Sequence, residues 1–194
     1  QIINDRENFD NHIKTINSQI REINTLINSF SDFARMPDPI FKKIDISKVI
    51  SGSILPYQTN YPNMIFHTKL KLNDKNIRID ENQIFRLFTN LIKNSVESIL
   101  ESQKKNGKII IKITEDKNNI LVNFIDNGLG FKIDHMNKSS EPYFTTKEKG
   151  SGLGLSIVSK IIFEHGGHIS FSNEKKQKGA EINFTISKKL WKKF

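Results

Sequence analysis

Two asparagines one helical turn apart are the first residues whose spacing suggests chemistry. Asn90 and Asn94 are four positions apart, so on a helix both amides project from the same face. Amide oxygens are hard ligands suited to Mg²⁺, which binds few protein groups and completes its shell with phosphates and water. The pair alone is a weak signal, because an Asn-rich sequence carries such pairs on many surface helices.

An aspartate and two glycines form the second candidate site. Asp126, Gly128 and Gly130 lie in the segment Asp-Asn-Gly-Leu-Gly, directly after an apolar run. A carboxylate at a strand end can accept a hydrogen bond from the amino group of adenine. The glycines let the backbone pass close to a planar ring and adopt positive φ. The alternative is an ordinary Asp-Asn-Gly turn, which this segment alone would favour.

A glycine-rich loop is the third candidate site. Residues 149–155, Lys-Gly-Ser-Gly-Leu-Gly-Leu, lead straight into a predicted helix. Free N–H groups and the positive end of the helix dipole make such a loop suitable for phosphate. It is neither a Walker A loop nor a dinucleotide fingerprint, because it has no Gly-Lys-Ser/Thr sequence and follows a loop rather than a strand.

The elements that must position these residues are both helices and strands. Asp80 to Gln83 has the form of a capping box, followed by apolar residues at helical spacing. Asp45 and Ser47 offer N-caps for a short helix that Pro56 closes. Longer helices are predicted at 81–103 and 153–165, and strands at 64–72, 108–115, 119–125, 168–173 and 180–187. This order predicts an α+β fold, a two-layer sandwich with helices on one face of a mixed sheet.

The N-terminal segment has a heptad pattern. Its apolar residues are spaced alternately four and three apart, which predicts a seam that must pack against other helices and favours dimerisation. An amphipathic helix lying on its own domain is the alternative. Pro37 and Pro39 end the helix near Met36. The seam residues are Phe9, Ile13, Ile16, Ile20, Ile23, Ile27, Phe30 and Ala34.

Composition narrows the function classes. The absence of cysteine excludes disulfides and thiolate metal sites, and it fits a reducing compartment. The net charge is +9, but the lysines are spread along the chain, so nucleic acid is not an expected partner. No apolar run approaches the roughly 18 residues that a membrane-spanning helix needs. We divide the chain into a helix at 1–36, a linker at 37–44, a domain at 45–189 and a basic tail at 190–194.

Together, four segments resemble the N, G1, F and G2 boxes of sensor histidine kinases. They are Asn90–Asn94, Asp126–Gly130, Phe144–Lys147 and Gly150–Gly154, in that order. The resemblance implies the Bergerat-type α/β sandwich shared with the gyrase, heat-shock chaperone and mismatch-repair ATPases, with ATP and Mg²⁺ as its cofactors. The first helix looks like the second helix of the dimerisation and phosphotransfer hairpin. Its ending, with Phe-Thr-Thr-Lys, is most similar to the nitrogen-regulation (NtrY-like) group.

The resemblance also implies roles for individual residues. Asn94 would be the Mg²⁺ ligand, and Asp126 would read adenine, with the backbone of Gly128 and Gly130 around the base. Residues 131–149 would form a lid over ATP, from which Lys147 would counter phosphate charge; a solvated lysine is the alternative. The other implied nucleotide contacts are Phe144, Thr146, Gly150, Gly152, Leu153 and Gly154.

Asn90 bears on the reaction type. In the hydrolysing relatives a glutamate stands one helical turn before the Mg²⁺-binding asparagine, and here that position holds Asn90. An amide cannot act as a base toward water, so the sequence favours phosphoryl transfer over hydrolysis. The rival interpretations are an anti-sigma-type serine kinase, which lacks a hairpin, and a non-catalytic signalling module with a vestigial site.

The expected phosphoacceptor is absent from this sequence. The family phosphorylates a His within a motif resembling His-Glu-x-Lys-x-Pro, and the chain has none. His12 lies only 25 residues before Pro37, too few for a helix, a turn and a returning helix. We therefore expect a chain that binds nucleotide without phosphorylating itself. Because it begins with Gln, we expect a longer, dimeric, membrane-anchored parent that acts on the cytoplasmic side and passes phosphate to an Asp of a response regulator.

Overall fold

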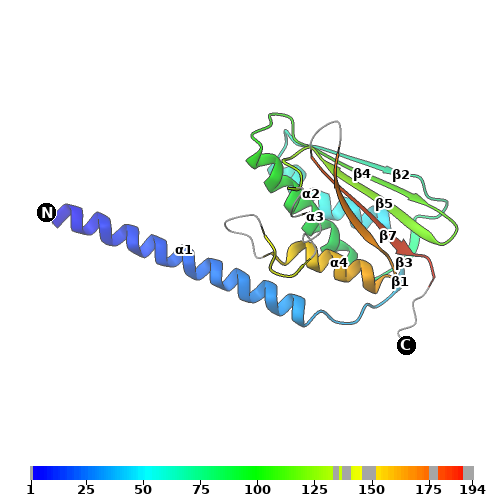
Figure 1. Ribbon diagram of the computed structural model, residues 1–194, viewed down its shortest axis with the longest axis horizontal. Helices are drawn as coiled ribbons and strands as arrows, with labels where there is room; N and C mark the ends of the chain where they lie inside the picture. Colours follow the sequence, from blue (N-terminus) through cyan, green and yellow to red (C-terminus); the bar gives the residue numbers. More distant parts are fainter. Residues whose placement is uncertain (1, 133–135, 137–140, 146–151, 175–178, 190–194) are drawn as a thin grey trace.

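The computed structural model consists of a long helix that projects from a compact α/β domain (Figure 1). It describes residues 2–132, 136, 141–145, 152–174 and 179–189. Helix α1 (Ile2–Ala34) leads through an extended segment into the domain, which holds all the other described elements. Helix α1 lies within the segment predicted as a helix at 1–36 and ends two residues before its expected C-terminal end.

A mixed five-stranded sheet forms one layer of the domain. Its strand order is β2-β4-β5-β7-β6, and only β2 and β4 run parallel. Inward-facing residues alternate with outward-facing ones, most clearly along β7, whose even-numbered side chains are buried. The strands are β2 (Ile65–Leu70), β4 (Lys108–Glu115), β5 (Asn119–Asp126), β6 (Ile169–Asn173) and β7 (Ala180–Ser187).

Three helices form the second layer and cover one face of the sheet (Figure 1). They are α2 (Ile46–Asn60), α3 (Glu81–Glu101) and α4 (Gly154–Glu164). The central helix, α3, packs against both of the others. Fully buried side chains between the layers include Phe88 of α3 and Phe124 of β5. Burial of the apolar side chains of this core is the main favourable contribution to the free energy of folding. The predicted α+β two-layer sandwich is therefore confirmed.

A second, two-stranded sheet was not predicted. Strand β1 (Lys42–Asp45) pairs antiparallel with β3 (Asn76–Ile79), so the second half of the expected linker at 37–44 includes strand residues. Both strands have only four residues: β1 shows no alternation, and the alternation of β3 is too short to distinguish a strand from a loop in the sequence.

Pro56 does not close the helix that Asp45 begins. Asp45 caps α2 as expected, accepting from the Ser47 amide at 2.9 Å, but the helix runs on to Asn60. Pro56 removes one N–H, and the carbonyl that loses this donor belongs to Gly52. Both residues are exposed, so water can bind that carbonyl and the helix continues past the proline.

The expected capping box at the start of α3 is only half present. Asp80 Oδ1 accepts from the Gln83 amide at 2.9 Å, as predicted. The Gln83 side chain instead donates to the carbonyl of Pro37, and the Asp80 N–H donates to His165 Nε2 at 3.1 Å. The other Asp80 oxygen accepts from Ile40 N at 2.7 Å. The segment that follows α1 is thus attached to α3 and α4 through Asp80, Gln83 and His165.

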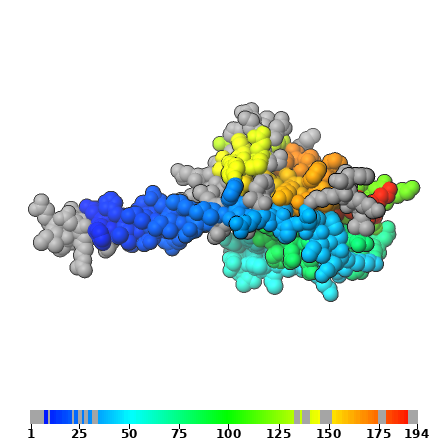
Figure 2. All heavy atoms as spheres, turned by 90° about the horizontal axis from the view of Figure 1, so that it is seen from below, coloured from blue at the N-terminus to red at the C-terminus, as the bar shows by residue number. Residues whose placement is uncertain are grey.

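The heptad seam of α1 is exposed from Phe9 to Phe30. The seam side chains from Phe9 to Phe30 are 41–62% exposed. The helix extends away from the domain, as Figures 1 and 2 both show, so it does not lie on its own domain. None of the described helices is long and apolar enough to cross a membrane.

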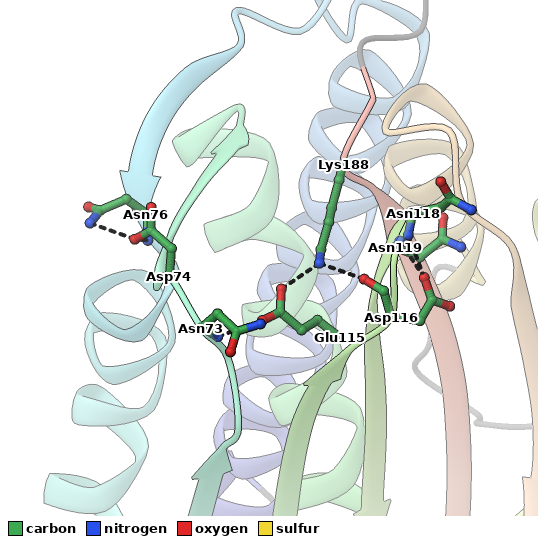
Figure 3. Close-up of polar contacts among 8 residues, drawn as sticks. All are labelled: Asn73, Asp74, Asn76, Glu115, Asp116, Asn118, Asn119 and Lys188. Carbon is green, nitrogen blue, oxygen red and sulfur yellow. Dashed lines mark hydrogen bonds and ion pairs between the residues drawn. The ribbon is translucent and has the colours of Figure 1, made fainter.

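Lys188 connects neighbouring segments at one end of the sheet (Figure 3). Its ammonium group contacts Glu115 Oε2 at 2.5 Å and donates to the Asp116 carbonyl at 2.6 Å. Glu115 Oε1 also accepts from the backbone N–H of Asn73. These contacts join the segment after β2, the β4–β5 turn and the end of β7. The hydrogen bond from Lys188, followed by the one from the Asn73 amide, lowers the pKa of Glu115.

Replacing Lys188 should weaken this end of the sheet in a pH-dependent way. We expect Lys188→Met to lower the thermal unfolding midpoint by a few degrees at neutral pH. A carboxylate whose pKa is lowered on folding contributes stability above its unfolded pKa, and this contribution disappears as pH falls through its folded pKa. The difference from wild type should therefore shrink in acid. Lys189→Met, at the exposed neighbouring position, is the matched control; an equal loss there would contradict the assignment.

Candidate nucleotide-binding site

A buried carboxylate lies at the centre of the candidate site. Asp126, the last residue of β5, is 3% exposed. Its Oδ1 accepts from the backbone N–H of Gly128 at 2.8 Å and of Ala180 at 3.1 Å. Its Oδ2 accepts from the Ser95 hydroxyl at 2.6 Å. Three donors from three elements therefore hold this side chain, and Asp126 is more than the first residue of a turn.

Helix α3 also holds the turn that follows Asp126. The Ser98 hydroxyl accepts from the Leu129 N–H at 2.9 Å. A Cβ at Gly128 would lie 2.9 Å from the backbone carbon of Ser98, so only glycine allows the turn to approach the helix this closely. Gly130 has a φ of 76°, as the sequence analysis expected of this segment.

The same turn is fastened on its other side to the start of β4. Asn127 Oδ1 accepts from the Lys108 N–H at 2.8 Å, and Asn127 Nδ2 donates to the Asn106 carbonyl at 2.8 Å. The Lys104 ammonium group contacts the carbonyl oxygens of Asn127 and Gly128. The backbone around the carboxylate is thus fixed by side chains from both flanking segments.

The two asparagines of α3 face the N-terminus of α4. A Cβ at Gly154 would lie 3.3 Å from Asn90 Oδ1 and 3.5 Å from Asn94 Nδ2. Asn90 Nδ2 donates to the Arg86 carbonyl at 2.8 Å, which leaves Asn90 Oδ1 directed toward α4. The structure therefore brings together two segments that are separated by about sixty residues in the sequence.

The N-terminus of α4 fits a phosphate group. Leu153, the N-cap residue, is 1% exposed and its side chain makes no capping hydrogen bond. In the described part of the chain, the first amides of α4 thus have no side-chain acceptor from their cap. Those amides and the positive helix end suit an anion, and the adjacent amide oxygens of Asn90 and Asn94 suit Mg²⁺. The donor set therefore fits a Mg²⁺–phosphate group.

The segment expected to form the lid meets the glycine-rich loop at Gly152. Gly152 has a φ of 67°, and a Cβ there would lie 2.7 Å from the Tyr143 carbonyl oxygen. Tyr143 itself has a φ of 67°, which is uncommon for a residue with a side chain. Phe144 follows it and is half-buried. Thr146, Lys147 and Gly150, three of the predicted site residues, lie outside the described residues.

The sequence analysis missed several contributors. Ser95 and Ser98 occupy helix positions three apart on the side that faces the Asp126 turn, and Ser95 is 3% exposed. Its inward position on α3 shows its role only once the helix is packed against the sheet, because a single serine in a helical segment carries no local signal. Ala180 contributes a backbone N–H, for which no side-chain signal exists in the sequence.

The pKa of Asp126 yields a stability prediction. Burial raises this pKa, and the hydrogen bond from Ser95 is the largest of the contacts that oppose the rise. A carboxyl group whose pKa is raised on folding contributes stability below its unfolded pKa and loses it as pH rises through the folded pKa. We expect Asp126→Asn, which removes the charge and keeps the shape, to leave the ligand-free protein at least as stable at neutral pH. Thermal unfolding without nucleotide tests this, and a lower midpoint than wild type would refute it.

Comparison with known proteins places the chain in a family. Residues 79–190 match the model for "Histidine kinase-, DNA gyrase B-, and HSP90-like ATPase". The chain is 33% identical over 188 residues to the nitrogen regulation protein NtrY of Azorhizobium caulinodans, covering 95% of this chain and 24% of that protein. It is 31% identical over 188 residues to a putative NtrY-like sensor histidine kinase of Rickettsia felis, covering 96% of this chain and 31% of that protein. The chain thus spans less than a third of the length of these relatives.

Solved structures agree with the fold. The catalytic domain of histidine kinase ThkA superimposes with a TM-score of 0.66 at 28% identity, covering 77% of this chain and 96% of that one. Full-length ShkA in complex with AMPPNP superimposes with a TM-score of 0.71 at 19% identity, covering 90% and 38%, and supports the fold alone. The resemblance drawn from the four sequence motifs is confirmed: the chain belongs to the histidine kinase-, DNA gyrase B- and HSP90-like ATPase family.

Proposed function

We propose that this chain is the ATP–Mg²⁺-binding and phosphate-donating portion of a two-component sensor histidine kinase. The observation that carries the proposal is the arrangement along α3. One stretch of this helix directs Asn90 and Asn94 at the N-terminus of α4, while Ser95 and Ser98 contact the Asp126 turn. A metal–phosphate site and a base site are therefore adjacent on one helix.

Asp126 would bind the adenine ring through its amino group. Its Oδ1 already accepts two amide hydrogen bonds, while Oδ2 accepts one from Ser95 and keeps a second acceptor direction. An exocyclic amino group is a donor and fits that direction. Gly128 and Gly130 would let the backbone lie close to the ring.

The phosphates would lie between α3 and the N-terminus of α4. The amides of Gly152, Leu153 and Gly154 would donate to phosphate oxygens, with the dipole of α4 favouring their negative charge. Asn94, with Asn90 beside it, would hold Mg²⁺. When bound, this ion neutralises phosphate charge as the terminal phosphoryl group leaves. Phe144, Thr146, Gly150 and Lys147 stay predictions as further contacts from the lid and loop.

Asn90 supports phosphoryl transfer rather than hydrolysis. Its amide lies at the metal–phosphate site but cannot accept a proton from water, and its Nδ2 already donates to the Arg86 carbonyl. Among the described residues, the side chains nearest to a Cβ at Gly154 are those of Asn90 and Asn94, and both end in amides. The residues at this site therefore position and neutralise ATP, and the acceptor must come from another group.

That acceptor would be a histidine of the parent protein. The curated relatives include NtrY-like proteins described as sensor histidine kinases, which supports this class of reaction. Histidine kinase ThkA has been solved in complex with the response regulator TrrA, and we extend a receiver-domain partner of that kind to this chain. Membrane anchoring of the parent on its cytoplasmic side is part of the same proposal.

The exposed seam of α1 supports a homodimer in the parent. Apolar residues from Phe9 to Phe30 that are 41–62% exposed are costly to leave in water, so further helices would cover them. A hairpin with its first helix, doubled by a second copy, would bury the seam in a four-helix arrangement.

Nucleotide titration tests the proposed site. By isothermal titration with ATP and Mg²⁺, we expect Asp126→Ala and Asn94→Ala each to weaken binding by about tenfold or more. The effect of Asn94→Ala should disappear when EDTA removes the metal, while that of Asp126→Ala should persist. Asn82→Ala, at an exposed position near the start of α3, is the matched control. Absence of binding, or binding that neither substitution affects, would remove the catalytic interpretation in favour of a vestigial site.

A labelling experiment tests the absence of an acceptor. With γ-labelled ATP and Mg²⁺, we expect no acid-labile phosphate on this chain alone, because it contains no His-Glu-x-Lys-x-Pro motif. Label should appear when a hairpin helix carrying that motif is supplied. Label on this chain alone, at His12 or elsewhere, would overturn the prediction.

A further inference from the structure

We propose that Ser95 is a positioning residue that makes the site selective for a 6-amino purine over a 6-oxo purine. It would do so through Asp126, by donating its only hydroxyl hydrogen to Oδ2 and so leaving that oxygen free to accept but not to donate. The inference rests on the proposed role of Asp126 as the adenine reader, and it assigns the source of base discrimination to a residue that need not contact the base.

The hydrogen bonds around Asp126 define what the carboxylate can offer a ligand. Oδ1 accepts from Gly128 at 2.8 Å and from Ala180 at 3.1 Å, and both donors are backbone amides that cannot reverse their role. Oδ2 accepts from the Ser95 hydroxyl at 2.6 Å. Of the four acceptor directions of a carboxylate, three are therefore occupied and one on Oδ2 remains.

Ser95 determines which acceptor direction of the Asp126 carboxylate stays open to a ligand. Ser95 and Asp126 are both 3% exposed, so bulk water cannot take the place of the Ser95 hydroxyl. A short O–H···O contact to an ionised acceptor is a strong hydrogen bond, and it holds the carboxylate plane against rotation. The hydroxyl also opposes the rise in the pKa of Asp126 that burial causes. Compared with a site that lacks the hydroxyl, Asp126 is therefore shifted toward its ionised, acceptor-only form.

This arrangement discriminates between purines at position 6. An amino group donates to the open direction of Oδ2, whereas a 6-oxo group places its lone pairs against those of the carboxylate. Without the Ser95 hydroxyl, Asp126 loses a hydrogen bond that favours ionisation. A protonated carboxyl group could then donate to a 6-oxo group. Removal of the hydroxyl should therefore weaken binding of the amino purine and relieve the penalty on the oxo purine.

Ser98 offers a matched comparison on the same helix. Its hydroxyl accepts from the Leu129 N–H, so it holds the turn but adds no donor to the carboxylate. Loss of that hydroxyl should weaken both nucleotides alike. The two serines thus separate a general effect on the turn from a specific effect on the carboxylate.

The test measures the affinities of ATP and inosine triphosphate, which differ in having an amino or an oxo group at position 6. By calorimetric titration of the full chain with Mg²⁺, we expect Ser95→Ala to reduce the preference for ATP by roughly tenfold. Ser95→Thr, which keeps the hydroxyl, should restore the preference, and Ser98→Ala should leave the ratio unchanged. In an Asp126→Asn background, Ser95→Ala should not change the ratio further, because the residue acts through the carboxylate.

The outcomes separate this inference from the proposed function. If Asp126→Asn removes the preference for ATP but Ser95→Ala leaves it intact, the inference about Ser95 is wrong and the adenine site stands. If Asp126→Asn leaves the preference intact, the adenine assignment is wrong and the inference fails with it. A preference that falls equally in Ser95→Ala and Ser98→Ala overturns the inference, since the effect is then general loosening of the turn.

Discussion

Burial of the Asp126 carboxylate constrains the structure around the proposed nucleotide site. A buried charge is costly unless donors surround it, and three elements supply them here: Ser95 from α3, Gly128 from the turn and Ala180 from β7. Strand β7 can supply its N–H only because it pairs with β5, and the backbone there is so close that a Cβ at Gly179 would lie 2.6 Å from the Asp126 carbonyl carbon. The pairing of β5 with β7, the position of Ser95 on α3 and the glycine at 179 are thus all required by the hydrogen bonds and close packing around Asp126.

Much of the fold could be predicted from periodicity, because long elements with one buried face leave a pattern. The heptads of α1, the apolar face of α3 and the alternation in β7 each extend over enough residues to be recognised. The predictions that were wrong or missing concern short elements and local features. Strands β1 and β3 have four residues each, and Pro56 continues a helix because its neighbourhood is exposed to water. The sequence also could not show that His165, rather than Gln83, would accept from the Asp80 amide, since that contact spans 85 residues.

The individual residues of the candidate site could be predicted from the sequence, but their arrangement in space could not. Each of Asn90, Asn94 and Asp126 has a chemical signal of its own, but their relation depends on how α3 packs between α4 and the sheet. The position of both asparagines beside Gly154 follows from that packing. Ser95 escaped notice because a single serine in a helix has no local signal; only its inward orientation, known once the helix is docked, gives it significance.

Helix α3 also connects the site to the N-terminal helix. Its first turn is attached to the segment after α1, since Asp80 accepts from Ile40 N at 2.7 Å and Gln83 donates to the Pro37 carbonyl. Its middle turns carry Asn90, Asn94 and Ser95. The segment after α1 is therefore fixed to the N-terminus of the helix that presents the proposed nucleotide contacts. The imidazole of His165 has both nitrogens engaged, by the Asp80 N–H and the Ile161 carbonyl, so the junction includes α4 as well. Helix α4 begins at the proposed phosphate site, and His165 is the C-cap residue at its other end. The N-terminus of α3 and the C-terminus of α4 therefore meet beside the segment that follows α1.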